Sequence, residues 1–298
     1  FKTSEPETLW LDPQQRLLLS VSHRIFLPAY ATKATDPRHL VICALAQAEN
    51  TQIVRSHIAI PNSFTATGQV TSAACGRISY FYGMKGACVT VNTACSASMV
   101  GLGLATVSIG AGASLDGSAY GVQINLDPFA MAAMHNASFL AADGRCKTLD
   151  ALGDGYVRSE ACSGLRLAHR QLDDSITLNE MRMRIHIVAV KQDGRSSSLT
   201  APNGPSQMEV IVVGFALASI SPAASSFLEL HGTGTSLGDP IEIGAASTTL
   251  RLDAPDRPQA VTLSAVKVWS GHAEPGAGLV AIAAMRQALE AQNSPGFM

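Results

Sequence analysis

The sequence predicts an α/β fold in which the sheets are largely buried. Two observations carry this prediction. Short apolar runs typical of strands alternate along the chain with longer runs at helical spacing. Of the 298 residues, 47% are hydrophobic and only 15% are charged, so the chain can bury a large core. The most apolar stretches, residues 99–113 and 210–220, are shorter than the roughly 20 residues of a membrane span.

The predicted elements alternate in order from the first residues to the last. Helices are expected at residues 13–20, 96–109, 207–218, 241–250 and 278–291, and strands at residues 89–92, 163–167, 184–190, 226–230 and 261–268. The polar stretch QLDDSITLNE, which begins at Gln171, is the predicted seam between two halves. We therefore expect one half over residues 1–170 and a second over residues 171–298, each with its own strands and helices.

Charge and cysteine content exclude several classes of function. Lys and Arg number 21 against 23 Asp and Glu, so the chain carries no electrostatic footprint for nucleic acid or an acidic membrane. The six cysteines include no CxxC pair, which argues against a zinc site or a dense disulfide framework. GxSxG, the Walker motif and a GxGxxG after a strand are also absent, so neither a serine hydrolase nor a nucleotide site is supported.

Three predicted junctions between a strand and a helix carry a residue with chemical potential. Cys95 follows the strand in TVNTACSAS and precedes a helix of small apolar residues. His231 follows a strand directly, before a Gly/Thr loop and a helix whose start Asp239 and Glu242 are expected to cap. His272 follows the strand and turn that contain Lys267. Ligands gather at the carboxyl ends of strands in open α/β sheets, so all three are candidates for one site.

Each of these residues also has a structural interpretation, since a single cysteine or histidine at such a position is often part of the core. Taken together, one thiol and two imidazoles suit acyl transfer. The thiol can hold an acyl group as a thioester, and the imidazoles can donate hydrogen bonds to an enolate oxygen or relay a proton.

Six blocks of the sequence resemble the β-ketoacyl synthase (ketosynthase) domains of polyketide and fatty acid synthases. They extend over nearly the whole chain in the order of that family. The blocks are LDPQQRLLL (11–19), GRISYFYGMKGACVTVNTACSAS (76–98), DGRCKTLDALGDGYVRSE (143–160), QDGRSSSLTAPNGPSQ (192–207), HGTGTSLGDPIEIGA (231–245) and VKVWSGHAEPGAG (266–278).

The resemblance implies a thiolase-like fold of two related halves in α-β-α-β-α layers. It implies that Cys95 is the acyl-accepting nucleophile and that His231 and His272 promote decarboxylation of a malonyl extender and stabilise the enolate. Lys267 matches the lysine that supports the histidines. Two threonines match those that hydrogen-bond the phosphopantetheine arm of acyl carrier protein: Thr233 and Thr235.

The implied reaction is acyl transfer to the cysteine followed by decarboxylative Claisen condensation with a malonyl group on the carrier protein. No metal and no tightly bound cofactor is expected, because the phosphopantetheine arrives on acyl carrier protein. The implied partners are that carrier, other synthase domains and a second copy of the chain, paired through the strand before the cysteine. We expect a cytoplasmic protein, with an organelle such as a plastid left open because the N-terminus is missing.

The sequence also departs from the family pattern. We expect the chain to be truncated at both ends, without the family's opening strand and its Gly-Phe-Gly-Gly motif, which helps to form the oxyanion hole. Ser159 and Ala161 stand where glycines are usual. The alternative hypothesis is therefore a catalytically impaired structural or assembly subunit. A thiolase would need a second cysteine near the C-terminus, and the last one here is Cys162. Cys146, Asp154 and Glu160 are expected to be structural.

Overall fold

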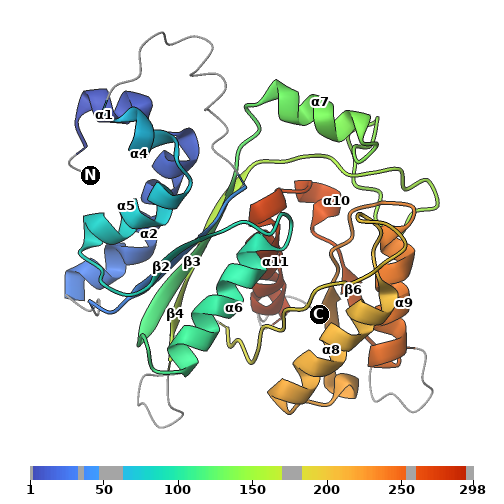
Figure 1. The fold of residues 1–298 in the computed structure, drawn as a ribbon. Coiled ribbons are helices and arrows are strands. Elements are labelled where there is room, and N and C mark those ends of the chain that lie inside the picture. Colours follow the sequence, from blue (N-terminus) through green and yellow to red (C-terminus); the bar gives the residue numbers. More distant parts are fainter. Residues whose placement is uncertain (1–2, 33–36, 47–62, 170–182, 253–259, 293–298) are drawn as a thin grey trace. The chain divides into compact units, whose positions relative to one another are not determined.

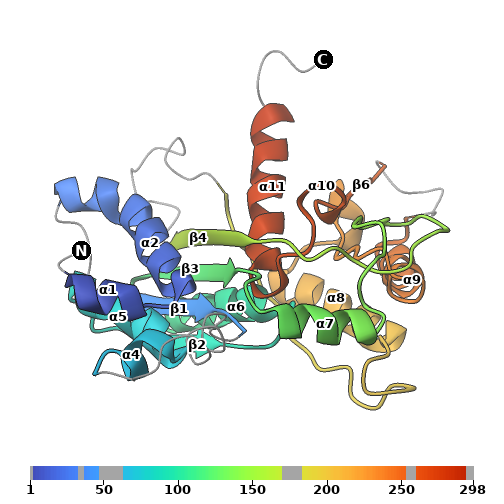
Figure 2. The same cartoon turned by 90° about the horizontal axis from the view of Figure 1, so that it is seen from above.

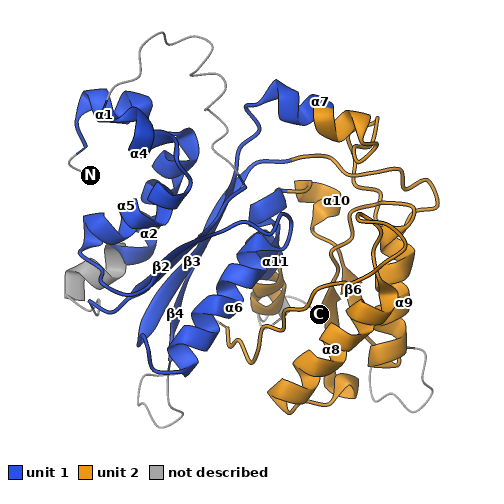
Figure 3. Cartoon of the chain, viewed as in Figure 1, with its two compact units in different colours: residues 1–132, 159–181, 273–282 blue, residues 133–158, 182–272, 283–298 orange. Residues whose placement is uncertain are grey.

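The computed structural model describes residues 3–32, 37–46, 63–169, 183–252 and 260–292. The chain divides into two compact units, which Figure 3 colours separately. The first unit comprises residues 1–132, 159–181 and 273–282, and the second comprises residues 133–158, 182–272 and 283–298. The predicted seam at Gln171 lies outside the described residues. Among the described residues, we find no helix with the length and apolar character that crossing a membrane requires.

Figures 1 and 2 show the helices and strands of the described residues. The strands are β1 (Leu40–Ala44), β2 (Cys88–Val91), β3 (Asp116–Gln123), β4 (Ala161–Ala168), β5 (Phe227–Glu229) and β6 (Thr262–Ser264). The helices are α1 (Glu5–Trp10), α2 (Pro13–Thr32), α4 (Thr65–Gln69), α5 (Ser72–Tyr82), α6 (Ala97–Gly110), α7 (Pro128–Asn136), α8 (Gly204–Ala218), α9 (Gly238–Leu250), α10 (Lys267–Ser270) and α11 (Ala277–Gln292), with 3-10 turns η1 (Pro222–Ala224) and η2 (Glu274–Gly276).

The first unit is built on a four-stranded sheet in the order β2-β1-β3-β4. β1 runs parallel to both neighbours, with Ile42 opposite Val89 on one side and Ala119 on the other. β4 is antiparallel to β3 and forms one edge, while β2 forms the other. All five residues of β1 are buried, which explains why its sequence is continuously apolar.

Each face of this sheet has its own apolar core, because side chains of β1 alternate between the two faces. Val41 and Cys43 belong to the core beneath α2 and α5. Leu40 and Ile42 belong to the core beneath α6. The helices therefore cover opposite faces of the sheet, as Figures 1 and 2 show, and hold β2 and the start of α6 in place.

Residues 273–282 of the first unit pack against the first turn of α6 and against β3. A Cβ atom at Gly121 of β3 would lie 2.9 Å from the Gly276 Cα and 3.2 Å from the Ser98 Cβ. A Cβ atom at Gly278 would lie 2.4 Å from the Met99 Cγ. Glycine is required at both positions for this close approach.

The second unit contains a parallel pair of strands, with Phe227 of β5 opposite Thr262 of β6. β6 is shorter than the predicted strand over residues 261–268, because Val266 has helical dihedrals and α10 begins at the next residue. The predicted strand over residues 184–190 is wrong, since these described residues have no partner in a ladder. Apolar alternation forms a strand only where a neighbouring strand takes up the backbone hydrogen bonds.

Candidate active site

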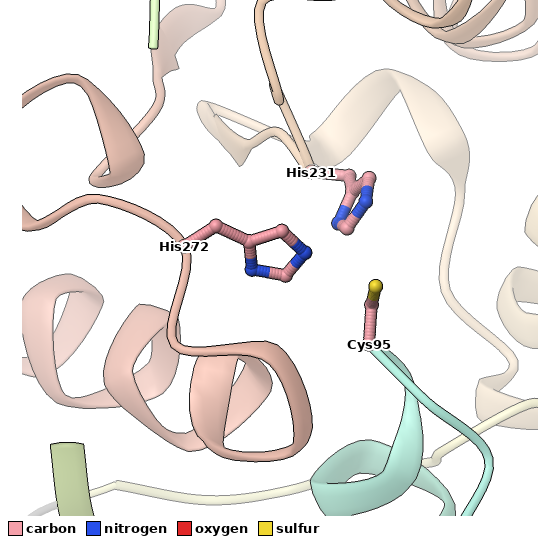
Figure 4. A group of neighbouring side chains, drawn as sticks. All are labelled: Cys95, His231 and His272. Carbon is pink, nitrogen blue, oxygen red and sulfur yellow. The ribbon is translucent and has the colours of Figure 1, made fainter. Parts of the chain in front are cut away.

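Cys95 lies on the turn that connects β2 to α6 in the first unit, as the sequence predicts. Its side chain is half-buried and projects from this turn in Figure 4. α6 begins two residues later, at Ala97. The first N–H groups of a helix have no partner within the helix and carry partial positive charge, so this position favours an anion such as a thiolate.

The backbone of this turn is strained and is held by side chains. Ala94, directly before the cysteine, has a φ of 51°, in the left-handed region that residues with a Cβ atom avoid. The Asn92 Oδ1 accepts a hydrogen bond from the Ala94 N–H at 3.2 Å, and the Asn92 Nδ2 donates to the Ala46 carbonyl at 2.9 Å. Strain that surrounding hydrogen bonds maintain is typical of functional turns.

His231 follows β5 in the second unit, and the carboxylate of Glu242 fixes its backbone. Glu242 accepts hydrogen bonds from the His231 N–H at 2.5 Å and from the Gly232 N–H at 2.8 Å. The sequence interpretation assigned Glu242 to helix capping alone, and this was wrong. The residue spans one turn of α9 to hold the loop that carries the histidine.

Asp239 also binds loops rather than capping α9. The helix begins at Gly238 with Leu237 at the N-cap position, which makes no side-chain cap bond. The Asp239 carboxylate instead accepts from the Leu149 N–H at 2.8 Å and the Gly234 N–H at 3.1 Å. A carboxylate in the first turn of a helix takes the nearest unpaired donors, and here neighbouring loops supply them.

His272 is completely buried and lies beside His231 within the second unit. Its N–H donates to the Val157 carbonyl at 2.8 Å, and the Tyr156 ring packs edge-on with a centroid distance of 4.9 Å. The centroids of the His231 and His272 rings are 5.4 Å apart, with an angle of 86° between the planes. Figure 4 shows the edge of one ring directed at the other.

Two cations lie in the surroundings of these histidines. Lys267, at the start of α10, is 3% exposed, and Arg158, which forms a β-bridge with His272, is 8% exposed. Burial, followed by the positive charges around it, lowers the pKa of His272 to about 2. His231 keeps an exposed edge, yet burial of the rest of the ring and the Lys267 ammonium lower its pKa to about 4. Both imidazoles are therefore neutral at pH 7.

A pair of neutral imidazoles beside buried cations has a definite chemical capacity. Each neutral ring carries one N–H donor and one acceptor nitrogen. The donors can stabilise negative charge that develops on an oxygen, and the positive surroundings attract a carboxylate or an enolate. Arg158 is a residue of this group that the sequence analysis did not identify. A lone Arg in an otherwise small and apolar block was the only signal for it.

Thr233 and Thr235 lie in the loop after His231, with their Oγ1 atoms 3.3 Å apart. Thr233 is 8% exposed, whereas Thr235 is half-buried. The Thr235 Oγ1 also accepts a hydrogen bond from the Gly238 N–H at 3.1 Å, so it supports the start of α9. His231, His272, Lys267 and the two threonines are thus all in the second unit, and Cys95 is in the first.

The residues expected to be structural have structural contacts. The buried Cys146 Sγ accepts from the Val157 N–H at 3.4 Å, and Asp154 pairs with Lys147 at 2.7 Å. The Glu160 carboxylate accepts from the Asn125 N–H at 2.8 Å. At two further positions, where glycines are usual in the family, the chain does not adopt a positive φ, so the added Cβ atoms cause no strain of that kind: Ser159 and Ala161.

Comparisons with known proteins agree with this arrangement. Residues 1–172 match the family model of the beta-ketoacyl synthase N-terminal domain, and residues 183–298 match that of the C-terminal domain. The chain belongs to the β-ketoacyl synthase family and is a ketosynthase domain with a thiolase-like fold.

Curated relatives of higher identity than the solved structures include two large synthases. The chain is 36% identical over 299 residues to mycoketide-CoA synthase of Mycobacterium tuberculosis, covering 99% of this chain and 7% of that protein. It is 38% identical over 305 residues to polyketide synthase GfsB of Streptomyces halstedii, covering 99% of this chain and 5% of that one.

Solved structures of similar fold are ketosynthases. The ketosynthase from module 6 of the bacillaene synthase of Bacillus subtilis has a TM-score of 0.80 and 28% identity, covering 97% of this chain and 50% of that one. The Streptomyces albus oxazolomycin ketosynthase domain OzmH KS7 has a TM-score of 0.81 and 27% identity, with the same coverage. The chain therefore spans about half the length of these solved chains and 7% or less of the curated relatives named above.

Proposed function

We propose that this chain catalyses chain extension in polyketide synthesis, by acyl transfer to Cys95 and decarboxylative Claisen condensation with a malonyl group on acyl carrier protein. The observation that carries the proposal is the neutral pair of His231 and His272 beside buried cations, in a chain of the β-ketoacyl synthase family. Nothing in the structure favours the alternative of an impaired assembly subunit.

In the first stage, the Cys95 sulfur attacks the carbonyl carbon of an acyl thioester. A new S–C bond forms, the bond to the pantetheine sulfur breaks, and that thiol leaves with the proton that the cysteine lost. The position of Cys95 before α6 supports this role, because the helix N-terminus favours the thiolate and offers N–H groups to the developing oxyanion.

In the second stage, His231 and His272 act on the malonyl thioester. Loss of carbon dioxide breaks a C–C bond and leaves the electron pair as an enolate, whose oxygen accepts hydrogen bonds from the neutral imidazoles. The enolate carbon attacks the acyl group on Cys95, and the cysteine sulfur leaves as the thiolate. Lys267 and Arg158 favour the anions of this stage by their positive charge.

The proposal requires Cys95 and the histidines to act at one site. Chain connectivity supports this requirement. His272 directly precedes residues 273–282 of the first unit, which pack against the first turn of α6 through Gly278 and Met99. We propose that this covalent link keeps His272 close to the cysteine. The division into functional halves at residues 1–170 and 171–298 remains our proposal for the domain organisation.

Thr233 and Thr235 are proposed to bind the phosphopantetheine arm, since both hydroxyl groups lie in the loop after His231. The partners are then acyl carrier protein and a second copy of the chain. β2 is an edge strand with exposed residues at its start, and a strand edge of this kind can pair with an identical strand. The cytoplasm is the proposed location.

Acyl transfer to the cysteine tests this function directly. The chain is incubated with an acyl-pantetheine thioester, and its peptides are analysed by mass spectrometry. We expect the acyl mass on the Cys95 peptide, released by hydroxylamine, in the wild type and in the matched control C162S, and no label in C95S. Acylation of another cysteine, or none in folded wild type, would overturn the proposal.

Decarboxylation of malonyl carrier protein tests the histidines separately. Release of carbon dioxide should fall at least 10-fold in H231Q and in H272Q, while acylation of Cys95 persists in both. A histidine variant that decarboxylates at the wild-type rate would refute the assigned role.

A further inference from the structure

A second pair of reactive side chains lies in the first unit, away from the residues discussed so far. Cys75 is in the first turn of α5, and Cys88 is the first residue of β2. The Cys75 Sγ lies 3.1 Å from the Oγ1 of Thr90. Since alternate residues of a strand share a face, Cys88 and Thr90 both face α5. The two thiols are also hydrogen-bonded to each other.

The two cysteines differ in exposure and in ionisation. Cys88 is exposed and Cys75 is buried. The Cys75 S–H donates to Cys88, and Ser79, one turn later on α5, donates as well, so the pKa of Cys88 falls to about 6. The same hydrogen bond, together with burial, raises the pKa of Cys75. A pair of this kind has one sulfur poised as a thiolate and a second that keeps its proton.

The other cysteines on this face of the sheet lack these properties. Cys43 is buried in the centre of β1, and burial raises the pKa of its thiol. Cys162 of β4 is half-buried, and burial raises its pKa to about 12. Reactivity on this face is therefore concentrated at Cys88, and Cys75 is its hydrogen-bonded neighbour.

We propose that Cys75 and Cys88 form a modification site at which a hydroperoxide oxidises the pair to a disulfide. The proposal stands on the thiol–thiol contact, the shared face with Thr90 and the exposure of Cys88. It is independent of the acyl transfer assigned to Cys95. Pairing of a second chain at the edge of β2 uses backbone groups in the plane of the sheet and leaves this face uncovered.

The chemistry proceeds in two balanced steps. The Cys88 thiolate attacks one peroxide oxygen, an S–O bond forms, the O–O bond breaks, and hydroxide leaves and takes up a proton as water. Cys88 is then a sulfenic acid, oxidised by two electrons, and the peroxide is reduced. The Cys75 sulfur attacks the Cys88 sulfur, an S–S bond forms, and the sulfenic hydroxyl leaves as water with the proton of Cys75.

Both sulfurs must approach to about 2.05 Å, the length of a disulfide bond. They start within hydrogen-bonding distance, so movement of side chains in one turn of α5 is sufficient. In a reducing compartment such disulfides are transient, which suits a sensor of oxidants rather than a structural bond.

The test is oxidation of the whole chain with a few equivalents of hydrogen peroxide, followed by alkylation and peptide mass spectrometry. We expect a peptide that links Cys75 to Cys88, two mass units lighter than the reduced pair and reversed by dithiothreitol. In C75S, Cys88 should instead accumulate as the sulfenic acid, trapped by dimedone. In C88S, Cys75 should remain a thiol.

C162S is the matched control and should form the linked peptide in the same yield as the wild type. The wild-type experiment needs no substitution, so it remains decisive if C75S fails to fold. A wild-type chain in which Cys88 stays reduced, or in which it links to another cysteine or to a second chain, would overturn the proposal. Acylation of Cys95 is measured on a different peptide, so failure here leaves the proposed function untouched.

Discussion

The buried imidazole of His272 makes the stability of the chain depend on pH in a calculable way. Its pKa is about 2 in the folded chain against 6.5 for an ordinary histidine. Between these values the unfolded chain binds a proton that the folded chain does not, so stability is complete above pH 6.5 and falls as the pH decreases. Each pH unit below 6.5 costs about 1.4 kcal/mol, which gives about 2 kcal/mol at pH 5.

The assay is urea unfolding at pH 7 and pH 5, with the wild type compared with H272Q. The drop in the free energy of unfolding between the two pH values should be about 2 kcal/mol smaller in H272Q than in the wild type, because glutamine does not titrate. H135Q, at an exposed histidine on α7, serves as the control and should behave as the wild type. Equal drops in H272Q and the wild type, or an NMR titration of His272 near pH 6.5 in the folded chain, would refute the reasoning.

Three further substitutions test the supports of the site. In E242Q the amide keeps one acceptor for the two N–H groups at His231 and Gly232, which costs about 1.5–3 kcal/mol, so decarboxylation should slow roughly 10- to 100-fold; an equal loss of acylation would contradict a role confined to the histidine loop. G121A should lower the free energy of unfolding by about 1–3 kcal/mol, because its Cβ would lie 2.9 Å from the Gly276 Cα. G76A, where a Cβ meets no atom within 4 Å, is the matched control, and equal urea midpoints for the two variants would show that the contact is not tight. A94G removes the Cβ from a residue with a φ of 51° and should stabilise the chain by up to about 1 kcal/mol in urea unfolding; a destabilised variant would mean that the turn is not strained.

Local patterns predicted the elements that carry the chemistry. The strand before Cys95 and the helix after it were expected at residues 89–92 and 96–109, and the structure has β2 at Cys88–Val91 and α6 at Ala97–Gly110. These elements are buried on a regular spacing, so their pattern is visible in the sequence. The strand predicted over residues 184–190 failed because its pairing depends on a neighbour that no local pattern specifies.

The roles of charged residues were harder to predict, because they depend on contacts between distant parts of the chain. Asp239 has the sequence signature of a helix cap, yet its carboxylate binds Leu149, 90 positions away. Arg158 forms a β-bridge with His272 although the two are far apart in sequence. A sequence pattern can show that a carboxylate stands at a helix start, but the donors that it binds come from the tertiary fold.

The central claim is that Cys95 and the two histidines serve one reaction. A single-turnover experiment tests it most directly: chain acylated at Cys95 is purified, malonyl carrier protein is added, and the 3-oxoacyl product on the carrier is followed by mass spectrometry. We predict that the acyl group leaves Cys95 as the product appears, and that H272Q retains acylated Cys95 without forming product. Product formation by acylated H272Q at the wild-type rate would contradict the claim.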